Sequence, residues 1–113
     1  MTSPPRMSLV FTDGIANICV QGEVDLANAA ELQALGEDAL SDSGGAGGSD
    51  RSGGGVRIDL SEVTFIDSTG LAALLAIRHR AGETGRKIIL DRPSPRVRKI
   101  LDITGLAGAF AIE

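Results

Sequence analysis

The sequence is poor in aromatic residues and in cysteine. Its 113 residues include no Trp, no Tyr and three Phe, so the stacking platforms on which many proteins bind single-stranded nucleic acid are almost absent. Cys19 is the only cysteine and cannot form an internal disulfide. In its apolar run we expect it to be a small buried hydrophobe, and a chain without disulfides suits a reducing, cytoplasmic setting.

Basic charge and long apolar runs are also scarce. Lys and Arg number 11 against 15 Asp and Glu, for a formal net charge of −4, and this acidic balance disfavours binding to the backbone of nucleic acids. No stretch approaches the roughly twenty apolar residues of a membrane span, and the apolar run near the N-terminus is too short for a signal peptide. We therefore expect a soluble chain whose partner is a protein or small ligand, and neither nucleic acid nor a membrane.

The groups that catalysis needs are few. The only histidine, His79, lies between two arginines late in a predicted helix, where a solvated position is the simpler interpretation. One Cys and one His leave no soft-metal site, and the acidic residues are dispersed. No GxSxG motif surrounds Ser68, and no Gly-Lys-Ser/Thr follows the glycine-rich stretch. The sequence therefore predicts no catalytic, metal-binding or cofactor-binding residues, and a protein that is not an enzyme.

The length suits a single domain spanning residues 1–113. Near its start, the Asp13-Gly14 pair predicts a hairpin turn between two strands, at 9–12 and 15–21.

A helix is predicted next, because the spacing of the apolar residues changes from two to between three and four. Asp25 or Asn28 is a candidate N-cap of this helix, and its apolar face comprises Leu32, Leu35, Ala39 and Leu40. The following glycine- and serine-rich stretch, at about 41–55, has nothing apolar larger than Ala. We expect it to be a flexible surface loop.

The rest of the chain alternates strands and helices. The predicted elements are strands at 56–66, 87–91 and 109–112, a helix from Ser68 that stops at Gly82 or Gly85, and a helix with Ser94 as N-cap, Pro95 at the first position and Gly105 as terminator. The order is β-β-α-β-α-β-α-β. It predicts an α/β fold, in which helices pack on a mixed sheet of about four to five strands.

The stretch TFIDSTGLAAL places Asp67 and Ser68 at a corner between a strand and a helix. Free N–H groups and the positive dipole end at a helix start can receive an anion, so the fold would tolerate a phosphate on Ser68. Such a phosphate adds about −1.5 to −2 charges beside Asp67, and beside Asp25 if that turn lies at the same edge. The alternative is that Ser68 only caps the helix.

Three segments, GEVDLANAAEL, VRIDLSEVTFIDSTGLAALL and KIILDRPSPRVRKILDITGL, resemble in order and spacing the STAS-domain anti-sigma factor antagonists of bacteria, also called anti-anti-sigma factors. The resemblance covers residues 22–106 and implies the STAS fold. Its most specific element is IDSTGL, in which Ser68 corresponds to the phosphoacceptor of the family; Thr69 is an alternative acceptor. The GE-x-D turn of the family corresponds to Gly22, Glu23 and Asp25.

What the resemblance implies is partner switching in the control of transcription, as in stress responses. The unphosphorylated antagonist binds an anti-sigma factor that is also a serine kinase, and thereby frees a sigma factor. The kinase supplies ATP and magnesium and phosphorylates Ser68, the modified form dissociates, and a serine phosphatase restores binding. The docking surface would comprise Asp25 and Asp67 together with the exposed start of the helix, at Thr69, Gly70 and Leu71.

Two alternatives remain from other functional classes. A STAS-like structural or sensing module, in a signalling assembly or a transporter complex, would share the fold without using the serine. An enzyme acting on nucleotides is disfavoured, because the glycine-rich stretch lacks a following Gly-Lys-Ser/Thr and groups that could act as a catalytic base are few. The sequence also departs from the family in its long glycine-rich stretch. Members usually continue past the last strand into another helix, whereas this sequence ends at Glu113, which predicts an exposed part of the sheet or helix surface.

Overall fold

The computed structural model describes residues 7–45 and 55–113. Its elements are β1 (Met7–Thr12), β2 (Ile15–Val24), α1 (Ala29–Gly45), β3 (Gly55–Ile66), α2 (Ser68–Glu83), β4 (Lys87–Asp91), α3 (Pro95–Thr104), a 3-10 turn (Leu106–Ala109) and β5 (Ala111–Ile112). The predicted order of strands and helices is confirmed. Helix α1 extends into the stretch that we expected to be a loop, and the remainder of that stretch, at 46–54, lies outside the described residues.

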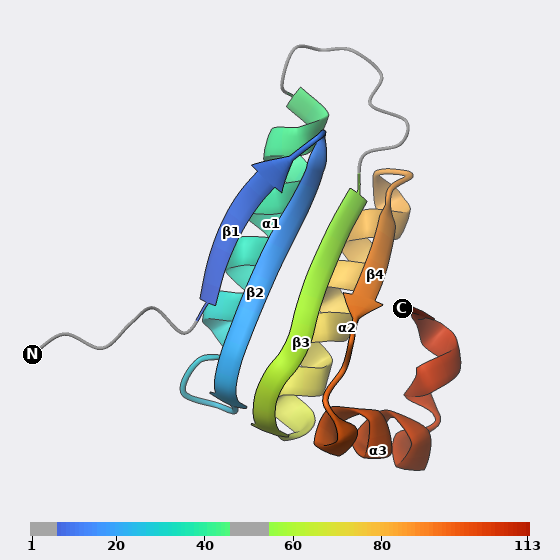
Figure 1. Cartoon of the computed structure of the whole chain (residues 1–113). Helices are drawn as coiled ribbons and strands as arrows, with labels where there is room; N and C mark the ends of the chain where they lie inside the picture. The colour runs from blue at the N-terminus through green and yellow to red at the C-terminus, as the bar shows by residue number, and fades with distance from the viewer. Residues whose placement is uncertain (1–6, 46–54) are drawn as a thin grey trace, which may run out of the picture.

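The five strands form one mixed sheet in the order β1-β2-β3-β4-β5, in which β1 is antiparallel to β2 and the other pairs are parallel. Asp13 and Gly14 both have positive φ, of 53° and 79°, as the predicted tight turn requires. Helices α1 and α2 cover one face of the sheet, and α3 lies at one end of it (Figure 1). None of the helices within 7–45 and 55–113 is long and apolar enough to span a membrane.

The core lies between the sheet and the two covering helices. It is mainly aliphatic, and its largest fully buried side chains are Ile18, Leu32, Leu40, Ile58, Leu60, Leu74, Ile77, Leu90 and Leu101. Helices α1 and α2 also pack closely on each other at Gly36, where a Cβ atom would lie 2.4 Å from Cγ1 of Ile77. Glycine at this position therefore sets the separation of the two helices.

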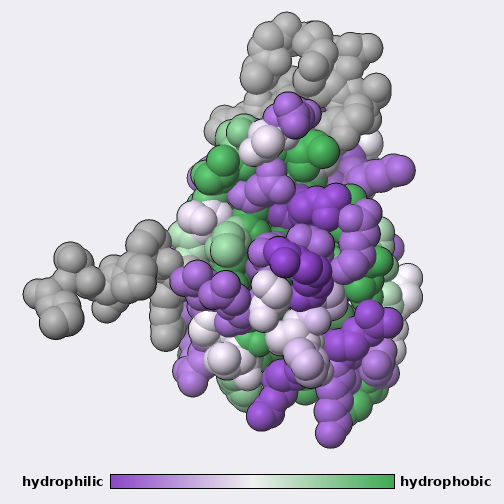
Figure 2. Space-filling view, in the orientation of Figure 1, coloured by the Kyte–Doolittle hydropathy of each residue, from purple (hydrophilic) through white to green (hydrophobic). Residues whose placement is uncertain are grey.

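The other face of the sheet is open and polar (Figure 2). Ion pairs join its strands: Arg57 lies 2.8 Å from Glu113 and 3.3 Å from Asp91, and Arg92 lies 2.9 Å from Asp59. These charged pairs explain why this face can meet water without a covering helix.

Cys19 lies on this open face, so the expectation that it is a buried hydrophobe is wrong. Its neighbours along β2, Ile18 and Val20, point into the core, whereas Cys19 is half-buried. Burial, assisted by the charges of Asp59 and Glu62, raises the pKa of the Cys19 thiol and keeps it protonated. The polar residues two positions away on either side, at 17 and 21, were the sequence signal for this orientation.

The predicted ends of α3 are confirmed. Ser94 accepts a hydrogen bond from the amide of Val97, Pro95 takes the first helical position, and Gly105 ends the helix with a φ of 77°. The Ser94 hydroxyl also donates to the carbonyl of Val63 at 2.6 Å. One side chain thus caps α3 and holds it against the carboxyl-terminal part of β3.

Candidate functional site

The sheet brings two distant segments of the chain together at one edge. Strands β2 and β3 are parallel neighbours, and their last residues, Val24 and Ile66, are paired. Beyond this pair, the amide of Asp67 donates to the carbonyl of Val24 at 3.2 Å. The turn that starts at Asp25 therefore lies beside the corner at Asp67 and Ser68, which meets the condition for a phosphate on Ser68 to lie near Asp25.

Asp67 is the N-cap of α2. Its Oδ1 accepts hydrogen bonds from the amides of Thr69 at 2.9 Å and Gly70 at 3.1 Å, and from the Thr69 hydroxyl. The Thr69 hydroxyl, followed by the Gly70 amide, lowers the pKa of the Asp67 carboxyl. The alternative in which Ser68 caps the helix is therefore wrong, because Asp67 already makes the capping bonds.

Ser68 is the first residue of α2, and its side chain is exposed. Within residues 7–45 and 55–113 its hydroxyl has no hydrogen-bond partner. Thr69 differs on both points, since it is half-buried and its hydroxyl donates to Asp67. The geometry thus leaves Ser68 as the more accessible of the two hydroxyl groups.

The expectation that Gly70 and Leu71 are exposed is wrong. Both are buried, Leu71 with 7% of its surface exposed. A Cβ atom on Gly70 would lie 2.6 Å from Cγ1 of Ile66 and 2.8 Å from Cγ1 of Val24. These two residues therefore fix the start of α2 against β2 and β3, which positions Ser68.

The turn between β2 and α1 is closed by side chains. Asp25 Oδ1 accepts from the amide of Ala27 at 3.0 Å, and Asn28 Oδ1 accepts from the amide of Asp25 at 3.0 Å. The Asn28 side chain also donates to the carbonyl of Glu23 at 2.8 Å. Asp25 and Asn28 were the two predicted N-caps of α1. The side-chain hydrogen bonds of both lie within the turn, and Asn28 bonds to residues that precede it, which fixes the shape of the turn.

Two exposed apolar residues of this edge were not predicted from the sequence. Leu26, in the turn, is 79% exposed, and Phe65, near the end of β3, is 41% exposed. Phe65 falls within the strand predicted at 56–66, where nothing in the local pattern indicates an exposed side chain. For Leu26, the signal was its place directly after the acidic turn motif, where an apolar side chain has no helical or strand periodicity to bury it.

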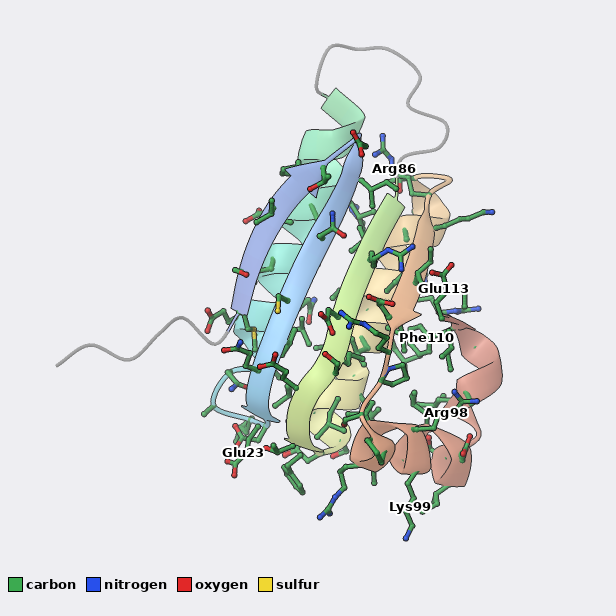
Figure 3. All side chains as sticks on the ribbon, viewed as in Figure 1. Glu23, Arg86, Arg98, Lys99, Phe110 and Glu113 are labelled. Atoms are coloured by element: carbon green, nitrogen blue, oxygen red, sulfur yellow. The ribbon has the colours of Figure 1, made fainter. Side chains whose placement is uncertain are left out.

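Two hollows of the described surface lie away from this corner. One of about 440 Å³ is at the end of α2, by Arg78 and Arg86, and one of about 600 Å³ is on α3, by Arg96 and Lys99. Figure 3 shows Lys99 projecting from α3 and Glu23 at the end of β2. His79, as predicted, is exposed, with Glu83 3.4 Å away.

We predict that acid weakens the Asp67 cap. A carboxyl whose pKa is lowered in the folded state stabilises the fold above its unfolded pKa, near 3.8, and loses that contribution as the pH falls through the lower folded value. Asp67→Asn has no such titration. In urea denaturation, the stability of wild type relative to Asp67→Asn should therefore decrease between pH 5 and pH 2; a constant difference would contradict the assignment.

The model of the STAS domain family matches residues 6–113. Among curated proteins, a STAS-domain containing protein of Pseudomonas aeruginosa (strain UCBPP-PA14) is 42% identical over 56 residues, which cover 50% of this chain and 55% of that protein. The anti-sigma-F factor antagonist RsfB of Mycobacterium tuberculosis (strain ATCC 25618 / H37Rv) is 28% identical over 114 residues, with 99% of this chain and 85% of RsfB covered.

Solved structures share the fold. An anti-sigma factor antagonist from Mycobacterium paratuberculosis superposes with a TM-score of 0.71 at 27% identity, covering 98% of this chain and 89% of that one. The Bacillus cell fate determinant SpoIIAA in its phosphorylated form gives a TM-score of 0.68 at 20% identity, covering 95% and 90%. The family model, the relatives and the fold agree, and the chain belongs to the STAS domain family and is related to anti-sigma factor antagonists.

Proposed function

We propose that this protein is an anti-sigma factor antagonist whose binding is switched by phosphorylation of Ser68. The chain works as one domain in the cytoplasm. Its unphosphorylated form binds an anti-sigma factor that is also a serine kinase and so releases a sigma factor, and a serine phosphatase reverses the modification. In this scheme Ser68 is the substrate of the kinase, which supplies the ATP.

The observation that carries this proposal is the exposed, unpartnered hydroxyl of Ser68 within the described residues, beside a helix start that Asp67 already caps. A kinase can phosphorylate this hydroxyl without breaking a hydrogen bond of the fold. Thr69, in contrast, must first release its bond to Asp67.

The same cap determines what a phosphate on Ser68 would do. The expectation that free amides at this helix start receive the phosphate is wrong for Thr69 and Gly70, because both amides already donate to Asp67. The charge of that phosphate would therefore face the partner, whose nucleotide phosphates lie opposite Ser68 when the kinase acts. Two like unit charges about 5 Å apart cost about 3 kcal/mol at an effective dielectric constant of 20, which is over a hundredfold in affinity.

The test begins with a pull-down from lysate of the source cells, with wild type, Ser68→Ala and Ser68→Asp as baits. We expect wild type and Ser68→Ala to retain an ATP-binding anti-sigma factor. With that protein purified and ATP added, mass spectrometry should find one phosphate, on Ser68, in wild type and Thr69→Ala and none in Ser68→Ala. Retention of the same non-kinase protein by all three baits would instead indicate a structural STAS module.

A further inference from the structure

Leu26 has the most exposed large apolar side chain in the described part of the chain. Its exposed fraction is 79%, against 41% for Phe65 at the same edge of the sheet. An isolated exposed leucine is common on protein surfaces. The position of this one sets it apart, because it follows Asp25 directly in the turn beside the corner that carries Ser68.

The turn holds Leu26 in a fixed position. The amide of Ala27 donates to Asp25, the amide of Asp25 donates to Asn28, and Asn28 donates to the carbonyl of Glu23. The amide of Ala29 also donates to the carbonyl of Asp25 at 2.8 Å. An apolar side chain on such a closed turn loses little backbone entropy when it enters a pocket, which favours its use as an anchor.

The two segments that form this edge, 22–28 with Leu26 and 61–68 with Ser68, are acidic. Glu23 is exposed and pairs across the sheet with Phe65, while Asp25 and Asp67 lie at the ends of the two strands. Neither segment of this edge, 22–28 or 61–68, contains Lys or Arg. A partner surface that covers this edge must offer an apolar pocket for Leu26 and positive charge around it, since unpaired buried carboxylates are costly.

We propose that Leu26 is an anchor of the docking surface, and that it enters an apolar pocket of the anti-sigma factor whose rim carries Lys or Arg. This inference rests on the proposed function and specifies the partner surface. The positive rim meets the turn at Glu23 and Asp25, whereas the nucleotide meets Ser68. The unmodified surface therefore binds by apolar contact and opposite charge at the turn, and a phosphate on Ser68 adds repulsion beside it.

The test uses the full chain and the anti-sigma factor recovered with it, with affinities measured by calorimetry. Leu26→Ser should weaken binding at least tenfold, while its thermal midpoint stays that of wild type because the side chain is exposed. Val10→Ser is the matched control: Val10 is 56% exposed, but it pairs with Asn17 toward the other end of β2. Its affinity should remain within threefold of wild type.

The negative charge of the turn is tested separately with the double variant Glu23→Gln/Asp25→Asn, in which each side chain keeps one carboxylate oxygen as an amide carbonyl and loses its charge. Wild-type affinity should fall as NaCl rises from 50 to 300 mM, and less steeply in the double variant. The inference would be overturned if Leu26→Ser bound with the affinity of wild type, or if the wild-type affinity did not depend on salt. In either case, loss of binding in Ser68→Asp would still support the proposed function. Failure to recover any ATP-binding anti-sigma factor would contradict both.

Discussion

Ser68→Asp is expected to weaken binding to the anti-sigma factor by about a hundredfold, whereas Ser68→Ala should bind like wild type. The substituted carboxylate places a permanent charge at the exposed first residue of α2. Because Asp67 occupies the amides of Thr69 and Gly70, that charge projects toward the partner and meets the bound nucleotide. Calorimetry with the purified anti-sigma factor and ADP measures the difference directly.

The control for added charge is Ser8→Asp. Ser8 is an exposed serine of β1 that pairs with Cys19, five residues before the end of β2 at Val24. It should leave the affinity within threefold of wild type. The switch interpretation fails if Ser68→Asp binds as tightly as Ser68→Ala while both remain folded by circular dichroism.

Gly70→Ala is expected to lower the free energy of unfolding by about 1–3 kcal/mol, as overpacking of a tight core does. The new methyl group would lie 2.6 Å from Ile66 Cγ1, 2.8 Å from Val24 Cγ1 and 3.1 Å from the Val24 carbonyl oxygen. The start of α2 must then move away from the sheet, and Ser68 moves with it. Urea denaturation at pH 7 measures the loss of stability.

The same substitution in the same helix provides the control. A Cβ atom on Gly82 would meet nothing within 4 Å, and alanine is the better helix former. Gly82→Ala should therefore raise the free energy of unfolding by about 0.5–1 kcal/mol. Equal effects of the two substitutions would show that helix propensity, and not contact with β2 and β3, explains the glycine at position 70.

Features that depend on a few neighbouring residues could be predicted from the sequence. The turn at Asp13-Gly14 follows from the backbone freedom of that pair, and the two ends of α3 follow from Ser94 and Gly105. The start of α2 at Ser68 could also be predicted, because the spacing of the apolar residues changes there from that of a strand to that of a helix.

Burial within the site could not be predicted in this way, because it depends on how separate elements dock. Gly70 and Leu71 are covered by side chains of β2 and β3, which the local pattern does not reveal. Asp67 and Ser68 are adjacent and both can cap a helix, so the sequence pattern could not decide which of them is the N-cap of α2. The resemblance to a family identified the serine, and the structure then showed that its hydroxyl is free within the described residues.

The parallel pairing of β2 and β3 also bears on how such a protein can change during evolution. The carboxyl ends of both strands, Val24 and Ile66, lie beside the corner at Ser68, so α1 ends and β3 begins at the opposite end of the strands (Figure 1). The twelve residues of β3 separate Gly55 from Ile66 by about 36 Å at 3.3 Å per residue. Insertions and deletions between 45 and 55 therefore fall at the end of β3 opposite the docking surface proposed above, so the length there can change without altering that proposed surface.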